Sequence, residues 1–154
     1  MNKRAIQGWG LLILSVVVLG ILVSCSGAPG DKNPKDVVIS LFGAMERDER
    51  ATIAHLLDMP ALMSDRNDDY ALQRDEARVF HNPEELLNDL TGEGTTKRAW
   101  FSLQRVIGDT EIAGDTALVE VSFMNKRTGT LYYTQFGLHR AQDRWKIFSF
   151  KANQ

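Results

Sequence analysis

The spacing of hydrophobic positions changes twice along the chain. Residues 11–23 form one almost continuous apolar run. From Asn33 to Leu90 the apolar residues recur at helical spacing, and from Lys97 onward they form β-rich runs separated by turn residues. Helices followed by strands, without alternation of the two, are typical of the α+β class. We therefore expect N-terminal helices packed on one face of a curved antiparallel sheet of about four strands.

Capping residues indicate where the helices begin. Asn33 before Pro34, and Asn82 before Pro83, each place a capping side chain ahead of a proline suited to the first helical position. Asp48 is expected to cap a second helix that Pro60 ends. The apolar faces of the three helices are Val37, Val38, Leu41, Phe42 and Met45; Ile53, Leu56 and Leu57; and Leu86, Leu87 and Leu90. Each helix therefore has one face to bury.

The β-rich runs predict four strands, at residues 99–107, 112–124, 130–139 and 145–151. The connections between them are short and contain turn residues, with Gly108-Asp109 as the first. Short connections join neighbouring antiparallel strands, so a meander is expected. Side chains alternate between the two faces of such a sheet. The alternation alone leaves open which face the helices cover.

The apolar run and its flanks are typical of a secretory signal. Lys3 and Arg4 precede the run. A helix over residues 11–23 would be about 20 Å long, shorter than the ~30 Å hydrocarbon layer of a membrane. This length favours a cleaved signal peptide over residues 1–24. An uncleaved anchor is the alternative, because the run can be extended back to Ala5.

The sequence Leu22-Val23-Ser24-Cys25 at the end of this run resembles the bacterial lipobox in all four positions. The resemblance implies that Cys25 becomes the first residue, with a lipid on its sulfur and an acylated amino group. Two or more acyl chains hold a protein on a membrane permanently. We therefore expect a lipid-anchored protein of the bacterial cell envelope, with its domain on the periplasmic or extracytoplasmic side. By the same resemblance, Ser26 in place of an aspartate implies outer-membrane delivery in a cell with two membranes.

Composition and charge narrow the range of partners. Residues 25–32 are small, polar and rich in helix breakers, as expected of a flexible tether, and residues 33–154 are long enough for a single domain. Removal of the signal peptide takes two of the 18 basic residues and none of the 20 acidic ones, which leaves a net charge of −4. This charge argues against a nucleic-acid partner and against electrostatic attachment to an anionic membrane. The lipid is the expected membrane contact.

Known metal and phosphate motifs are largely missing. Cys25 is the only cysteine, so a thiolate metal site is excluded. His55 and His81 have no second ligand one helical turn away, and zinc is not expected. Residues 91–96 are rich in glycine but lack the lysine of a phosphate loop, so we expect an ordinary helix-to-strand connection there. No cofactor is expected.

One acidic segment is an exception, because Asp65 to Glu76 resembles an EF-hand calcium loop. Asp65, Asn67, Asp69 and Glu76 occupy the first, third, fifth and twelfth positions of such a loop. Tyr70 stands at the sixth position, where the sharp turn normally requires glycine. Calcium binding through this loop is one alternative function.

Several segments together resemble the nuclear transport factor 2-like superfamily, and more narrowly its small bacterial lipoprotein members of unknown function. They are the opening Asn33-Pro34-Lys35-Asp36-Val37-Val38, the helix that bears Asp48, the later strands and the closing Trp145-Lys146-Ile147-Phe148-Ser149-Phe150. The resemblance covers Asn33 to Lys151. It implies a cone-like sheet wrapped around the helices, whose interior is a ligand pocket, an active site or only core.

Five polar residues of the predicted strands are candidates to line such a pocket: Gln104, Glu120, Tyr133, Gln135 and His139. The alternative is that they face solvent, as one face of an antiparallel sheet commonly does. No residue matches a catalytic motif of the superfamily by position. We therefore favour a non-catalytic module that binds a small apolar ligand or an envelope protein. The alternative is an isomerase- or dehydratase-like enzyme with His139 or Glu120 as its base.

Overall fold

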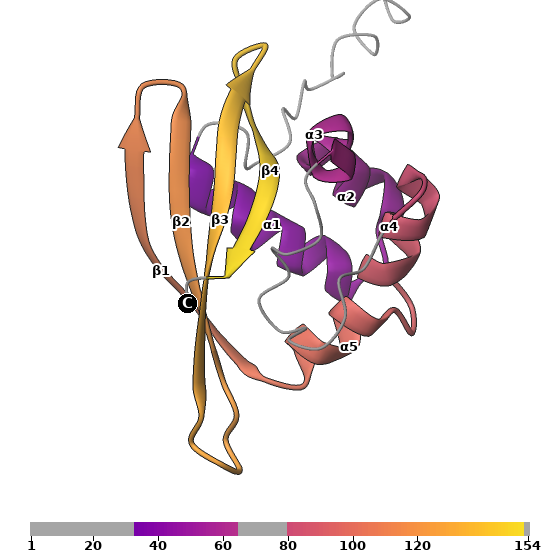
Figure 1. Ribbon diagram of the computed structural model, residues 1–154, viewed down its shortest axis with the longest axis vertical. Coiled ribbons are helices and arrows are strands. Elements are labelled where there is room, and N and C mark those ends of the chain that lie inside the picture. Colours follow the sequence, from indigo (N-terminus) through magenta and orange to yellow (C-terminus); the bar gives the residue numbers. More distant parts are fainter. Residues whose placement is uncertain (1–32, 65–79, 153–154) are drawn as a thin grey trace, which may run out of the picture.

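The computed structural model describes residues 33–64 and 80–152 (Figure 1). The helices in these ranges are α1 (Pro34–Glu46), α2 (Arg50–Leu56), α3 (Met59–Ser64), α4 (Pro83–Leu90) and α5 (Thr95–Phe101). The strands are β1 (Gln104–Ala113), β2 (Thr116–Met124), β3 (Leu131–Ala141) and β4 (Arg144–Ala152). They form one antiparallel sheet in the order β1-β2-β3-β4, with the helices on one side of it. The α+β class and the meander are thus confirmed.

Both asparagine caps form as expected. Asn33 Oδ1 accepts a hydrogen bond of 3.0 Å from the backbone N–H of Lys35 at the start of α1. Asn82 Oδ1 accepts one of 3.0 Å from the backbone N–H of Glu85 at the start of α4, and the Glu85 carboxylate accepts from the backbone N–H of His81 in return. These bonds satisfy amides that the first helical turn leaves without partners.

Asp48 does not cap the second helix, contrary to the prediction. Its backbone is left-handed, with φ of 57°, and α2 begins only at Arg50. The Asp48 carboxylate instead accepts hydrogen bonds from the backbone N–H of Gly92 at 2.6 Å and from the Lys97 ammonium at 2.7 Å. The residue therefore links the α1–α2 corner to the α4–α5 connection.

The second helix also ends earlier than predicted. It stops at Leu56, and Leu57 is extended and forms an isolated parallel bridge with Ile147 of β4. Asp58 N–H donates to the Ile147 carbonyl at 2.7 Å. This pairing to the sheet edge ends the helix, whereas Pro60 lies inside α3.

Residues 95–101 form helix α5, so the first strand begins at Gln104 and not near residue 99. The start of α5 is capped from a distance, because Asp89 Oδ1 accepts from the backbone N–H groups of Thr95 and Thr96 at 3.1 and 3.3 Å. Gly94 permits this close approach, since a Cβ atom there would lie 2.1 Å from the Asp89 carbonyl oxygen. The glycine-rich segment thus connects two helices, and the prediction of a helix-to-strand connection was wrong.

The prediction also placed the first turn of the sheet at the wrong residues. Gly108-Asp109 lies inside β1, where the pairing with β2 shifts register between Ile107 and Thr110. The turn between the two strands is at Gly114-Asp115, and the φ of 62° at Gly114 suits glycine there. Ile112 accordingly belongs to β1 and not to β2.

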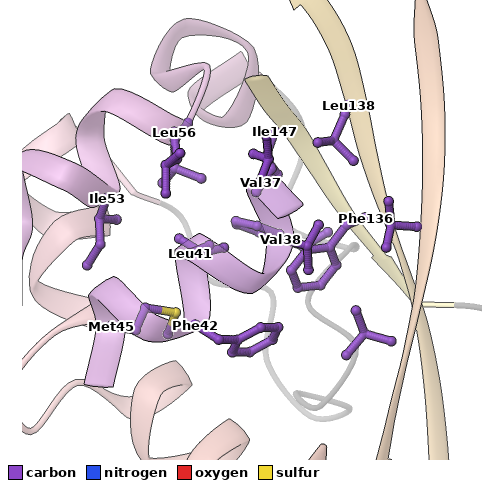
Figure 2. Close-up of a cluster of buried hydrophobic side chains, with 14 of the residues drawn as sticks. Val37, Val38, Leu41, Phe42, Met45, Ile53, Leu56, Phe136, Leu138 and Ile147 are labelled. Atoms are coloured by element: carbon purple, nitrogen blue, oxygen red, sulfur yellow. The ribbon is translucent and has the colours of Figure 1, made fainter. Parts of the chain in front are cut away.

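The helices cover one face of the sheet, and apolar side chains fill the space between the two layers. Figure 2 shows residues of α1 and α2 directed toward Phe136, Leu138 and Ile147 on the strands. Beside them Phe42, Trp100, Phe123, Phe136 and Phe150 form a cluster of ring contacts, with centroids 5.1–6.2 Å apart. All five rings are buried. Trp100 thus belongs to the core and reaches it from helix α5.

Helix length also bears on membrane contact. In residues 33–64 and 80–152, no helix is both long enough and apolar enough to cross a membrane.

Candidate functional site

The five polar residues proposed for a pocket lie on the sheet face that the helices leave uncovered. They are Gln104 on β1, Glu120 on β2, and Tyr133, Gln135 and His139 on β3. Gln104 alternates with the half-buried Arg105, and each of the other four has a buried neighbour along its strand; Glu120 lies directly opposite Gln135. The helix-facing side, where a cone interior would be, is occupied by the aromatic cluster.

The two candidate bases among them are not neighbours. Glu120 pairs with Gln135, whereas His139 lies four residues further along β3, or about 13 Å at ~3.4 Å per residue. Glu120 packs near Gly108, where an added Cβ would meet its carboxylate at 3.3 Å. The structure therefore brings Glu120 and Gln135 together but keeps both away from His139.

The uncovered face also presents apolar side chains. Val106 of β1 is 54% exposed and Tyr133 of β3 is 45% exposed. Each is paired with Ser122 of β2, so the three residues form one row across the sheet. Leu118 and Leu131 on the same face are exposed as well. This face is therefore mixed in polarity and open to solvent.

A hollow of about 430 Å³ lies at the β4 edge of the sheet, between the α2–α3 segment and the β3–β4 hairpin. Leu57, Met59 and Pro60 provide an apolar wall, and Arg144 and Lys146 of β4 provide a basic one. The hairpin turns through Gln142-Asp143, whose positive φ angles of 51° and 62° are those of a tight two-residue turn. That turn brings β4 back beside β3, with its first residues next to the helices (Figure 1).

His55 contacts the charged groups of both Arg144 and Lys146 in the basic wall. The Lys146 ammonium donates to the His55 carbonyl, and an Arg144 guanidinium nitrogen lies 3.1 Å from His55 Nε2. Since an arginine N–H can only donate, this second contact requires that Nε2 carry no proton. His55 lies in the last turn of α2, where the exposed carbonyls of a helix attract cations. The end of α2 thus positions both side chains at one wall of the hollow.

Asp58 joins three elements at the floor of this region. Besides its backbone bond to β4, its Oδ1 accepts a hydrogen bond of 3.1 Å from the backbone N–H of Ala61 and so caps α3. Its Oδ2 lies 2.8 Å from Nε2 of His139. The geometry of this contact is not that of a hydrogen bond, and it is a close approach between the carboxylate and the ring. Asp58 therefore ties the start of α3 to both β3 and β4.

The arrangement is better suited to binding than to catalysis. An aspartate beside a histidine can orient a general base, and the His139 ring also packs 5.4 Å from the Phe148 ring. In the part of the chain that the structure describes, no cluster of three or more His, Cys, Asp or Glu could hold a metal ion. What the hollow offers is a pair of cations facing an apolar wall, which is a means of holding a charged ligand.

Sequence reasoning missed four of the residues at this site, namely His55 as a positioning residue, Asp58, Arg144 and Lys146. The only available signal was the alternation of Arg144 with Lys146, and Arg144 lies one residue before the predicted strand over residues 145–151. The lipidation site Cys25 lies outside the described residues. So do the calcium ligands Asp65, Asn67, Asp69 and Glu76.

Three comparisons bear on the family of this chain. No model of a known protein family, no curated protein and no solved structure gives a significant match. Membership of the nuclear transport factor 2-like superfamily therefore stays a prediction.

Proposed function

We propose that this protein is a lipid-anchored component of the bacterial cell envelope, whose domain is a non-catalytic binding module with the hollow beside the β3–β4 hairpin as its ligand site. The observation that carries this proposal is the hollow itself, which combines two oriented cations with an apolar wall. Ligand sites are typically concave and combine apolar walls with convergent polar groups. The filled aromatic core favours this surface over a site inside the fold.

The anchor is the second part of the proposal, and the sequence around Cys25 supports it. We expect processing before Cys25, acylation of that residue and an association with the outer membrane in a cell with two membranes. Mass spectrometry of the N-terminal peptide from intact protein would detect the acylated cysteine. Recovery of the unmodified peptide over residues 1–24, still attached, would instead support an uncleaved anchor.

The length of the tether limits how far from the membrane the domain can bind a ligand. The seven residues between Cys25 and Asn33 span at most about 25 Å when fully extended. A domain held by such a tether samples ligands and partners close to the membrane surface. The proposed function is therefore binding at the envelope membrane, on a fold that we also propose to be nuclear transport factor 2-like.

Site-specific photocrosslinking in intact cells tests the binding site. A photoreactive amino acid at Gln142, on the rim of the hollow, should form an adduct that mass spectrometry detects. Gln104 is a matched control, because it is also an exposed glutamine but lies on the uncovered sheet face. An adduct at Gln104 alone would move the site to that face, and no adduct at either position would contradict the binding role.

An isomerase- or dehydratase-like enzyme is the second candidate, favoured by the contact between Asp58 and His139. In this role Asp58 would orient His139 as a general base. Incubation with a small-molecule extract of the envelope, followed by mass spectrometry, would then show conversion by the wild type and none by His139→Gln. Equal product profiles with and without the wild-type protein would count against it.

A further inference from the structure

We propose that the hollow binds a phosphate group through Arg144 and Lys146, with the organic part of the ligand against the wall formed by Leu57, Met59 and Pro60. The proposal rests on the function proposed above and adds the chemical class of the ligand. It replaces the small apolar ligand expected from the sequence with one that has a phosphate at one end.

The first support is the way in which the two cations converge. Arg144 and Lys146 alternate on β4, so their side chains leave the same face of the strand about 7 Å apart. Each contacts a different atom of the same residue, since Arg144 meets the His55 ring and Lys146 meets the His55 carbonyl. His55 therefore fixes the spacing of the two charged groups.

The second support is the number of hydrogen-bond donors of Arg144 and Lys146 that do not contact His55. A guanidinium group carries five N–H donors and an ammonium group carries three. One donor from each group is directed at His55. The remaining N–H groups are available to a tetrahedral anion, which arginine and lysine bind well because these hydrogen bonds are charge-assisted.

The third support is charge. Arg47, Arg50, Lys97 and Arg140 each have a carboxylate within ion-pair distance. Among the ion pairs within residues 33–64 and 80–152, none includes Arg144 or Lys146. Asp58, the carboxylate that lines the hollow, uses one oxygen to cap α3 and the other to contact His139. The basic wall is thus a local positive site on a chain whose net charge is −2.

A phosphate ligand at this site has two possible sources with the same chemistry. One is a free phosphorylated small molecule, in which the phosphate is a monoester. The other is a phospholipid headgroup, in which it is a diester and which the short tether would bring within reach. The two sources are separated by soluble probes without acyl chains.

Calorimetric titration of the full chain in a neutral detergent tests the proposal. The probes are inorganic phosphate, glycerol 3-phosphate as a monoester and glycerophosphoglycerol as a diester, with glycerol as the uncharged control. Arg144→Gln should weaken phosphate binding about tenfold or more, as expected for the loss of a charge-assisted hydrogen bond. Arg140→Gln is the matched control, because it removes the same charge from the same hairpin but Arg140 packs over Trp145. It should change the affinity less than about twofold.

A second pair of variants keeps the test valid if Arg144→Gln does not fold. Ala54→Glu places a carboxylate in the lining of the hollow, whereas Ala51→Glu places one on the exposed face of the same helix. Only the first should abolish phosphate binding. Stronger binding of the monoester identifies a free phosphorylated ligand, and equal or stronger binding of the diester identifies a lipid headgroup.

Two results would overturn the proposal. One is the absence of binding by all three phosphate probes at millimolar concentration, and the other is an equal loss in Arg144→Gln and Arg140→Gln. If the phosphate probes fail while photocrosslinking at Gln142 still captures a ligand, the phosphate assignment is wrong and the binding function stands. If both experiments fail, the binding function is wrong as well.

Discussion

Phe136 and His139 are three residues apart on β3, yet they belong to two differently built regions. Phe136 is fully buried against Phe42, Trp100 and Phe150. His139 is partly exposed and lies against the Asp58 carboxylate at the edge of the helix layer. The first region is held by apolar area removed from water, which is not directional. The second depends on a few directed polar contacts between distant segments, and a single substitution can remove one of them completely.

The largest expected effect is in the aromatic region. Phe136→Ala should lower the free energy of unfolding by about 3–5 kcal/mol, because it removes a buried ring and leaves a cavity among the other aromatic side chains. Tyr133→Ala removes an aromatic side chain from the same strand but from the uncovered face, and should cost about 1 kcal/mol or less. Urea denaturation of both variants measures the difference. Equal losses would contradict the assignment of the two faces.

The next effect concerns the polar region. Asp58→Ala removes the cap of α3 and the contact with His139, and should lower the free energy of unfolding by about 1–2 kcal/mol. Asp58→Asn keeps a side-chain oxygen that can cap the helix, so its loss should be smaller. Urea denaturation again provides the measurement. If the two variants were equally destabilised, the contact between the carboxylate and His139, and not the cap, would account for the role of Asp58.

These two regions also differ in how well the sequence predicted them. The β-rich runs of the second half predicted the sheet but left open which of its faces the helices cover. In the structure Val121, Phe123, Phe136 and Leu138 are buried on that face. The asparagine caps could also be predicted from the sequence, because each side chain bonds to an amide only two or three residues away. Local signals of this kind determined the α+β class.

The parts that could not be predicted depend on contacts between distant residues. Lys146 and His55 are 91 positions apart, and no local pattern relates them. The same is true of Asp48, whose local context is typical of a helix cap but whose partners are Gly92 and Lys97. Helix α5 was not predicted, and its residues were assigned to a connection and to the start of a strand near residue 99, because the cap that begins α5 comes from Asp89 and not from the preceding residue.

The last and smallest expected effect concerns Asp48. It tests whether an exposed polar contact in the helix layer contributes to stability as the polar contacts at the hollow do. Hydrogen bonds from the Lys97 ammonium and from the Gly92 N–H stabilise the charged carboxylate and lower the pKa of Asp48 below its usual value. The group therefore contributes stability above the pKa of the unfolded chain, near 3.9. That contribution is lost as the pH falls through the lower pKa of the folded state.

The test is the stability of Asp48→Asn relative to the wild type as a function of pH. The wild type should be the more stable at pH 7, and the difference should shrink steadily below about pH 5, where the unfolded chain begins to take up the proton. Asp115→Asn is the matched control, since Asp115 is 83% exposed in the β1–β2 turn and its nearest cation, Arg140, is 3.9 Å away. Its difference from the wild type should be small at every pH. A difference for Asp48→Asn that stayed near zero at every pH would mean that the residue acts through its left-handed backbone at the α1–α2 corner, because asparagine shares that preference but not the charge.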